Sequence, residues 1–360
     1  MTAPKKKSAL NVMPGVDGAA ALNPNLRGSL KASKNLSVDD FVAGILAGKI
    51  SILSRAITLV ESTKAEHQIL AEQIINACMP HSGNALRIGI TGVPGVGKST
   101  FIESFGLHLI HQENKKVAVL AIDPSSEKNK GSILGDKTRM EKLSQHTAAF
   151  IRPSPSAGSL GGVARKTRET SILCEAAGFN IIIIETVGVG QSETAVKSMV
   201  DYFLLLLLPG AGDELQGIKR GIMEMADGIA INKADGENEA RARHASLDAK
   251  RALNLYPVGE NGWQVPVQLC SALENTHIED VWQDAERFER HMKTKGFFDK
   301  NRETQASFWL RETISESLLN HFQKNPEVKK RLAELELEIK NQSVSPFTAA
   351  RELINLFLQK

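Results

Sequence analysis

Residues 92–100 combine glycines, one lysine and two hydroxyl side chains at the spacing that binds a nucleoside triphosphate. Their sequence, GVPGVGKST, matches the pattern G-x-x-x-x-G-K-[ST] without a gap. In this pattern the glycines let backbone N–H groups surround the phosphates, the lysine reaches the β- and γ-phosphates, and the serine hydroxyl binds Mg²⁺. The predicted phosphate-binding loop comprises Gly92, Val93, Pro94, Gly95, Val96, Gly97, Lys98, Ser99 and Thr100.

The segments on either side favour a phosphate-binding loop over an ordinary glycine-rich turn. A largely apolar run at 86–90 enters the loop, and a helix-favouring run at 101–110 leaves it. This is the order of strand, loop and helix that the motif requires. The N-terminus of the helix adds a positive potential near the phosphates. We therefore expect Lys98 to contact phosphate and Ser99 to contact Mg²⁺.

A second motif predicts which base is bound. Asn232-Lys233-Ala234-Asp235 follows an apolar run, and in such a site Asp235 accepts hydrogen bonds from N1–H and the exocyclic amine of guanine. Lys233 would cover the base, and Asn232 would tie the loops together. Adenine presents an acceptor where guanine has a donor, and polar sites reject such analogues by ~10⁴-fold or more. We expect GTP and GDP to bind, with a second guanine-contacting loop at Ser271, Ala272 and Leu273.

Acidic residues at the ends of two predicted strands are candidates for holding Mg²⁺. Asp123 follows the apolar run at 117–122, and Glu185 follows the run at 181–184. Carboxylates at such strand ends hold Mg²⁺ directly or through water, although a strand-ending acid can also cap a helix. Glu185 stands where most GTPases place Asp in Asp-x-x-Gly, so its longer side chain predicts a water-mediated contact. The N–H of Gly188 would meet the γ-phosphate.

Two further segments, at 131–140 and 210–219, combine glycines with charged residues. Loops of this composition between the nucleotide motifs are typical of switch segments that respond to the third phosphate. The alternative is that both are plain surface loops.

The elements that must position these residues follow from seven short apolar runs separated by helical stretches. Runs such as 181–184, four consecutive isoleucines, do not alternate with polar residues, as expected for strands buried on both faces. We predict an α/β P-loop NTPase fold: a mainly parallel sheet covered by helices on both faces, with N- and C-terminal helical extensions. Ligands should lie at the C-terminal ends of the strands. The predicted strands are 86–90, 117–122, 148–151, 180–184, 202–208, 228–231 and 265–269.

Changes in pattern along the chain predict four parts. Residues 1–35 are rich in Pro and Gly and lack periodicity, which predicts a flexible tail. Residues 36–85 carry the pattern of two or three amphipathic helices and form the predicted N-terminal arm. The GTPase domain is placed at 86–285. Residues 286–360 return to helical periodicity and form the predicted C-terminal arm.

Composition limits the partners and the compartment. The net charge of +3, from 44 basic and 41 acidic residues, gives no support for a nucleic-acid or membrane-surface partner. The longest purely apolar block, 203–208, is too short to cross a bilayer. Three cysteines lie far apart and form no C-x-x-C motif, which favours a reducing compartment over a disulfide framework. Because no secretory or transit signal fits the first residues, we predict a cytoplasmic protein.

Four longer motifs carry a family resemblance. They are ETVGVGQSE at 185–193, PGAGDELQGIK at 209–219, GDKTRM at 135–140 and RPSPSAG at 152–158. Together they resemble the MeaB/ArgK-type GTPases, the accessory chaperones of adenosylcobalamin-dependent methylmalonyl-CoA mutase. The resemblance extends from about residue 41 to the C-terminus.

The resemblance implies a homodimer formed through the C-terminal helical arm. It also implies a protein that docks on the mutase, gates cofactor loading and the removal of damaged cobalamin, and meets adenosylcobalamin only through that partner. By position, it assigns Asp123, Asp136 and Glu185 to Mg²⁺ and to the attacking water. It places Lys219 in a third switch loop that stimulates hydrolysis when the partner is bound. Hydrolysis by the free protein is expected to be slow.

Two other functions remain open from the sequence. A GTPase metallochaperone for a nickel enzyme would call for a Cys/His cluster near the phosphate loop, whereas Cys78 and His81 are an isolated pair and Cys174 lies in a helical pattern. A P-loop kinase acting on a small molecule or a binding protein is the second alternative. The guanine motif at 232–235 argues against a kinase that uses ATP.

Overall fold

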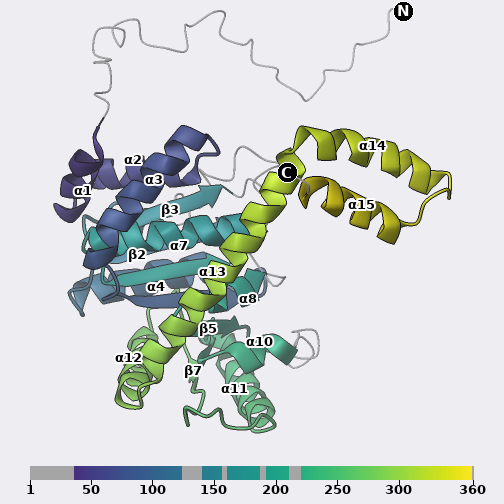
Figure 1. The fold of residues 1–360 in the computed structure, drawn as a ribbon. Helices are drawn as coiled ribbons and strands as arrows, with labels where there is room; N and C mark the ends of the chain where they lie inside the picture. Colours follow the sequence, from purple (N-terminus) through teal and green to yellow (C-terminus); the bar gives the residue numbers. More distant parts are fainter. Residues whose placement is uncertain (1–35, 124–139, 156–159, 187–191, 211–219, 359–360) are drawn as a thin grey trace, which may run out of the picture. The chain divides into compact units, whose positions relative to one another are not determined.

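Seven parallel strands form one sheet in the order β3-β2-β4-β1-β5-β6-β7 (Figure 1). Each strand coincides with one of the predicted apolar runs, and the predicted α/β class with a parallel sheet is confirmed. Strand β1 lies in the middle, between β4 and β5, so the loop that leaves it emerges at the centre of the carboxyl edge. The strands are β1 Leu86–Gly92, β2 Val117–Asp123, β3 Ala149–Pro155, β4 Ile181–Thr186, β5 Tyr202–Leu207, β6 Gly228–Ile231 and β7 Val267–Leu269.

This computed structural model describes residues 36–123, 140–155, 160–186, 192–210 and 220–358. The predicted tail at 1–35 lies outside the described residues. So do most of both predicted switch segments and parts of the motifs at 152–158 and 185–193.

Both faces of the sheet are buried, which explains the uninterrupted apolar runs. In β5, Leu204 and Leu206 pack into a core with helices α4 (Lys98–His111) and α12 (Ile278–Thr294). Leu205 and Leu207, which point the opposite way, pack with α10 (Arg220–Met225) and α11 (Glu239–Leu253).

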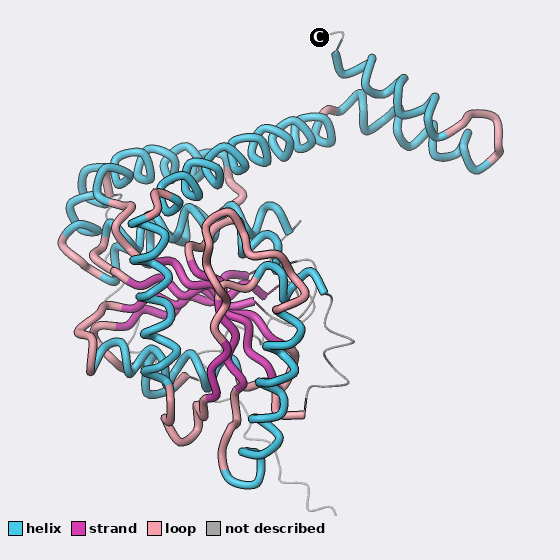
Figure 2. Tube along the Cα trace, turned by 90° about the horizontal axis from the view of Figure 1, so that it is seen from below, coloured by secondary structure: helices cyan, strands magenta, loops and turns pink. Residues whose placement is uncertain are grey.

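The longer α7 (Leu160–Ala176) and the short α8 (Ser192–Lys197) cover the remaining strands. Figure 2 shows the strands with helices on either side. Two short helices, α6 (Glu141–Ser144) and the 3₁₀ turn η3 (Gly236–Asn238), lie in the connections.

Three helices precede the sheet, as the periodicity predicted. They are α1 (Val38–Leu46), α2 (Ile50–Glu61) and α3 (Ala65–Cys78), followed by a 3₁₀ turn, η2 (Met79–His81). Their apolar faces are fully buried at residues such as Ile45, Leu53 and Ile74, and α2 and α3 pack against α7. The domain boundaries at 85 and 285 stay predictions. The second of them falls inside α12.

The C-terminal segment consists of α13 (Phe297–Lys324), α14 (Pro326–Lys340) and α15 (Pro346–Leu358). The first turns of helix α13 are anchored by polar contacts as well as by apolar burial. Nε2 of Gln305 donates to the carbonyl of Val200 at 2.7 Å, Nε1 of Trp309 donates to Ser198 at 3.0 Å, and Arg302 pairs with Asp201 at 2.6 Å. Helices α14 and α15 pack together through a small core of Val328, Leu335, Ala349 and Leu353.

Other expectations from the sequence concern the cysteines and the membrane. Cys78, Cys174 and Cys270 are buried free thiols, and burial raises the pKa of the Cys270 thiol to about 12. Among the helices that the structure describes, none combines the length and the apolar composition that crossing a bilayer requires.

Candidate nucleotide-binding site

The predicted phosphate-binding loop connects the central strand to a helix. Strand β1 ends at Gly92, and α4 begins at Lys98. Gly97 has a φ of +87°, and a β-carbon there would lie 3.0 Å from Nδ2 of Asn232. A β-carbon on Gly92 would lie 2.6 Å from the carbonyl oxygen of Leu206 in β5. Both positions therefore require glycine, the first for its left-handed backbone and the second because the neighbouring strand is so close.

Lys98 lies against the start of the loop. Its Nζ donates to the carbonyl of Gly92 at 2.8 Å and to that of Val93 at 3.4 Å. Burial lowers the pKa of Lys98, while the carboxylates of Glu185 and Glu193 act in the opposite direction. The lysine is thus held at the loop by carbonyl oxygens and by the field of two acidic residues.

The predicted strand-ending acid Glu185 lies next to the loop serine. Glu185 is 7% exposed, on β4 directly beside Ile90 of β1. The Ser99 hydroxyl donates to its Oε1 over 3.4 Å. A serine hydroxyl and a carboxylate are oxygen donors of the kind that Mg²⁺ prefers. The pair therefore fits the predicted metal role.

The structure describes less of the other predicted metal and switch residues. Asp123 ends β2, next to Pro155 of β3, and its backbone is at the carboxyl edge of the sheet as predicted. Its side chain is not described. Asp136, Gly188 and Lys219 lie outside the described residues.

Asn232 joins the phosphate loop to the predicted base-binding loops. It is 1% exposed, and its Nδ2 donates to the carbonyl of Val96 at 2.8 Å. Its Oδ1 accepts from the backbone N–H of Ala272 at 3.1 Å. One buried amide therefore fixes two loops relative to each other, since losing it would leave buried polar groups unpaired.

The remaining base-loop residues gather at the same place. Nζ of Lys233 donates to the carbonyl of Gly95 at 2.8 Å, so its stem lies along the phosphate loop. The Ser271 hydroxyl donates to Oδ2 of Asp235 and accepts from the N–H of Glu274 at 3.2 Å. Leu273 is 77% exposed, so it follows the predicted loop by position while its side chain faces outward.

The structure also brings in residues that the sequence did not assign. Glu193, on α8, is 1% exposed and acts on Lys98 electrostatically. The buried hydroxyls of Thr91 and Thr186, on neighbouring strands, are hydrogen-bonded at 2.9 Å. Glu193 is the last residue of the motif at 185–193, so that motif could have pointed to a role for Glu193 in the site. Thr186 ends β4 and belongs to the same motif, whereas Thr91 lies within β1, where nothing in the sequence distinguishes it from residues that only pack.

Comparison with known proteins identifies the family of this chain. A family model described as methylmalonyl-CoA mutase-associated GTPase MeaB matches residues 53–327. A probable GTPase of Mycobacterium tuberculosis, Rv1496, is 48% identical over 320 residues, covering 89% of this chain and 95% of the relative. GTPase ArgK of Escherichia coli is 47% identical over 306 residues, covering 85% and 92%. The mouse methylmalonic aciduria type A homolog, a mitochondrial protein, is 42% identical over 330 residues, covering 89% and 79%.

A solved structure shares the fold over most of the chain. The crystal structure of an LAO/AO transport system kinase is 40% identical, with a TM-score of 0.70, over 90% of this chain and 98% of the other. The parallel sheet, the phosphate loop and these relatives define a P-loop GTPase, an enzyme that binds guanine nucleotide and hydrolyses GTP. The chain belongs to the MeaB family. The resemblance seen in the sequence is confirmed.

Proposed function

We propose that this GTPase is a chaperone of an adenosylcobalamin-dependent acyl-CoA mutase, with methylmalonyl-CoA mutase as its partner. It hydrolyses GTP to GDP and phosphate and gates the loading and protection of the mutase cofactor. The observation that carries the proposal is the match of residues 53–327 to a family described as mutase-associated. The similarity to a methylmalonic aciduria type A homolog supports the same partner. We further propose a cytoplasmic location, to be tested by cell fractionation.

The site residues have distinct roles in this proposal. Lys98 contacts the β- and γ-phosphates, and Asp235 reads guanine with Ser271, Ala272 and Leu273 from the second loop. Ser99 and Glu185 hold Mg²⁺, assisted by Asp123 and Asp136, and the ion neutralises charge on the phosphates when it is bound. Asp136 and Glu185 orient the attacking water, Gly188 donates its N–H to the γ-phosphate, and Lys219 stimulates hydrolysis when the partner docks.

The decisive experiment is hydrolysis of GTP and of ATP by the purified protein, each with and without the mutase. We expect slow GTP turnover that rises by about tenfold or more with the mutase, because a partner can complete a GTPase site. ATP turnover should stay low. The Lys98→Ala variant mixed with the mutase is the control, because GTP hydrolysis by the mutase preparation itself would appear there.

Each other outcome has a clear meaning. GTP binding with no response to the mutase would retain the GTPase and reject the partner. A preference for ATP with phosphate transfer to an added acceptor would instead support the kinase alternative.

We also propose that the protein is a homodimer through its C-terminal arm. Beyond the anchored part of α13, Leu310, Ile314 and Leu318 are 63%, 50% and 58% exposed. Their spacing of four residues places them on one side of the helix. An exposed apolar stripe of this kind marks a protein interaction surface, and the predicted dimer gives it an occupant: the same stripe of a second copy.

The dimer can be tested by changing this stripe. The Leu318→Glu variant is expected to shift the mass in solution from twice 39.2 kDa to that of one chain, because a dimer would bury the new carboxylate. Sedimentation velocity at micromolar concentration measures this. Glu312→Lys changes the charge on the opposite side of α13 and should leave the dimer intact. A wild-type protein that sediments as a monomer at that concentration would reject the proposal.

A further inference from the structure

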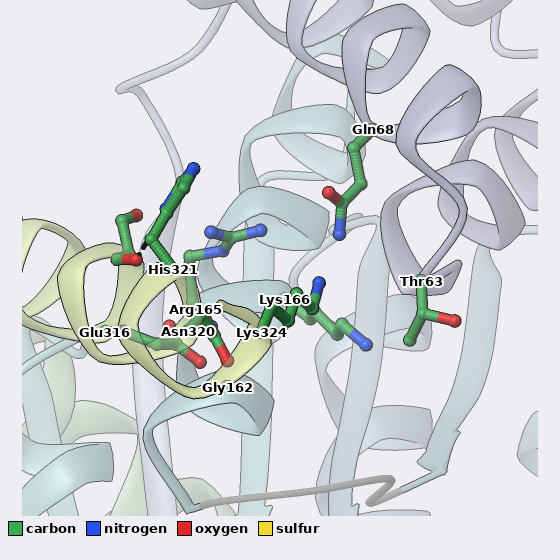
Figure 3. A pocket seen from close by; sticks show the side chains of 10 residues that line it. Thr63, Gln68, Gly162, Arg165, Lys166, Glu316, Asn320, His321 and Lys324 are labelled. Carbon is green, nitrogen blue, oxygen red and sulfur yellow. Dashed lines mark hydrogen bonds between the residues drawn. The ribbon is translucent and has the colours of Figure 1, made fainter. Parts of the chain in front are cut away.

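A polar cavity lies where α7, α13 and the start of α3 meet (Figure 3). Its volume is about 440 Å³, within the range of small-molecule sites. None of the residues that line it belongs to the nucleotide site described above. The cavity is therefore a second candidate binding site.

Apart from Gly162, every residue that lines this cavity carries a polar group, and most of the charged groups are basic. None of the ten lining residues has a purely hydrocarbon side chain, and the only carboxylate is that of Glu316. Against it stand Arg165 and Lys166 from α7, and Lys324 and His321 from α13. With histidine neutral, three positive charges face one negative charge. This balance of charges favours an anion.

The cations keep donors that a ligand can use. Lys166 uses one of its three ammonium hydrogens on the carbonyl of Glu61, at 2.9 Å. Arg165 pairs with Glu169 through Nε at 3.3 Å, which leaves its terminal nitrogens. Nζ of Lys324 makes no hydrogen bond or ion pair with the residues that the structure describes. The carboxylate of Glu169 offsets part of the charge of Arg165.

The uncharged hydrogen-bond donors of the cavity favour phosphate as the anion. Gln68 and Asn320 supply side-chain amides, while Thr63 and Ser317 supply hydroxyls. Phosphate offers several acceptor oxygens at once and binds best where cations and neutral donors converge. Figure 3 shows the side chains of Arg165, Lys166 and Lys324 between Gln68 and Thr63 on one side and Glu316 and His321 on the other. The volume exceeds that of one phosphate ion and leaves space for a small organic group.

We propose that this cavity binds a small phosphorylated anion, with its phosphate among Arg165, Lys166 and Lys324. The bound anion would join three segments that are distant in sequence: the start of α3, helix α7 and the end of α13. Beside the cavity, the backbone carbonyl of Glu61 at the end of α2 accepts from Lys166 of α7, and the Glu61 side chain accepts from Nε of Arg152 in β3 at 3.1 Å. A ligand that binds only the folded chain raises the melting temperature with concentration.

The test is calorimetric titration of protein saturated with a non-hydrolysable GTP analogue and Mg²⁺, so that the α-, β- and γ-phosphate positions of the phosphate-binding loop are all filled. The probes are orthophosphate, pyrophosphate and ribose 5-phosphate. We expect one site per chain for at least one probe, and a Kd that is about tenfold weaker in Lys324→Gln and in Arg165→Gln, since each removes a charged hydrogen bond. Lys330→Gln, an exposed lysine on α14, is the matched control and should bind as wild type does.

The probes distinguish the source of the phosphate. Tighter binding of ribose 5-phosphate than of orthophosphate would identify an organic phosphate, while equal affinity would identify the free ion. The melting temperature of each variant checks that it is folded. No titratable site in the wild-type protein would overturn the proposal. Binding that Lys324→Gln and Arg165→Gln leave unchanged would overturn it as well.

Discussion

Replacing Lys98 with alanine is expected to lower kcat/KM for GTP by about 10²–10³-fold, the usual loss when one charge-stabilising group is removed. The reason is its place at the loop. Lys98 is the first residue of α4, and its ammonium group lies 2.8 Å from the carbonyl of Gly92. From there the side chain would follow the loop to the β- and γ-phosphates. Alanine leaves the developing charge on the γ-phosphate without this cation.

The measurement is steady-state GTP hydrolysis beside nucleotide binding and thermal melting. Lys98→Arg keeps the charge but places a larger, planar group in a half-buried position, so it should also lose most activity. Lys330→Ala is the control for loss of an exposed lysine. A Lys98→Ala enzyme that keeps the wild-type kcat/KM would show that phosphate is not bound by this loop.

The nucleotide motifs could be predicted because each is local in sequence. The glycines at 92–100 show where the backbone must adopt an unusual conformation or approach another strand closely. The strands are visible in the sequence as apolar runs, because both faces of the sheet are buried. The way the motifs meet could not be predicted from spacing. Asn232 contacts Val96 and Ala272, which come from two different loops far from it in sequence. Only the packing of β1, β6 and β7 in one sheet brings those loops together.

Other features were hidden for a similar reason. The anchoring of α13 depends on carbonyl groups of Ser198 and Val200, which accept from Trp309 and Gln305. A backbone acceptor has no signature in the sequence. The basic cavity likewise combines Lys166 of α7 with Lys324 of α13. These two lysines are far apart in the sequence, and each alone looks like a solvated surface lysine.

Replacing Asp235 with asparagine is expected to shift the base preference of the enzyme from guanine toward xanthine. The carboxylate accepts from two donors of guanine, N1–H and the exocyclic amine. Asparagine can still accept from N1–H, but its amide nitrogen then faces the amine as a second donor. Because each hydrogen bond to a charged group contributes about 1.5–3 kcal/mol, the Kd for GTP should rise by about 10²-fold or more. Xanthine carries a carbonyl in place of the amine, so XTP should bind the variant better than the wild type.

The contact between Asp235 and Ser271 supplies the matched control. The serine hydroxyl donates to Oδ2 of Asp235, so a change at position 235 also disturbs this bond. Ser271→Ala removes the hydroxyl and keeps the carboxylate. It should therefore weaken GTP binding modestly without admitting XTP. Competition of GTP and XTP for each variant separates the two effects. If Asp235→Asn loses GTP without gaining XTP, while its melting temperature is unchanged, Asp235 supports the loop and does not read the base. If Asp235→Asn binds GTP more weakly and XTP more tightly than the wild type does, the carboxylate itself selects guanine.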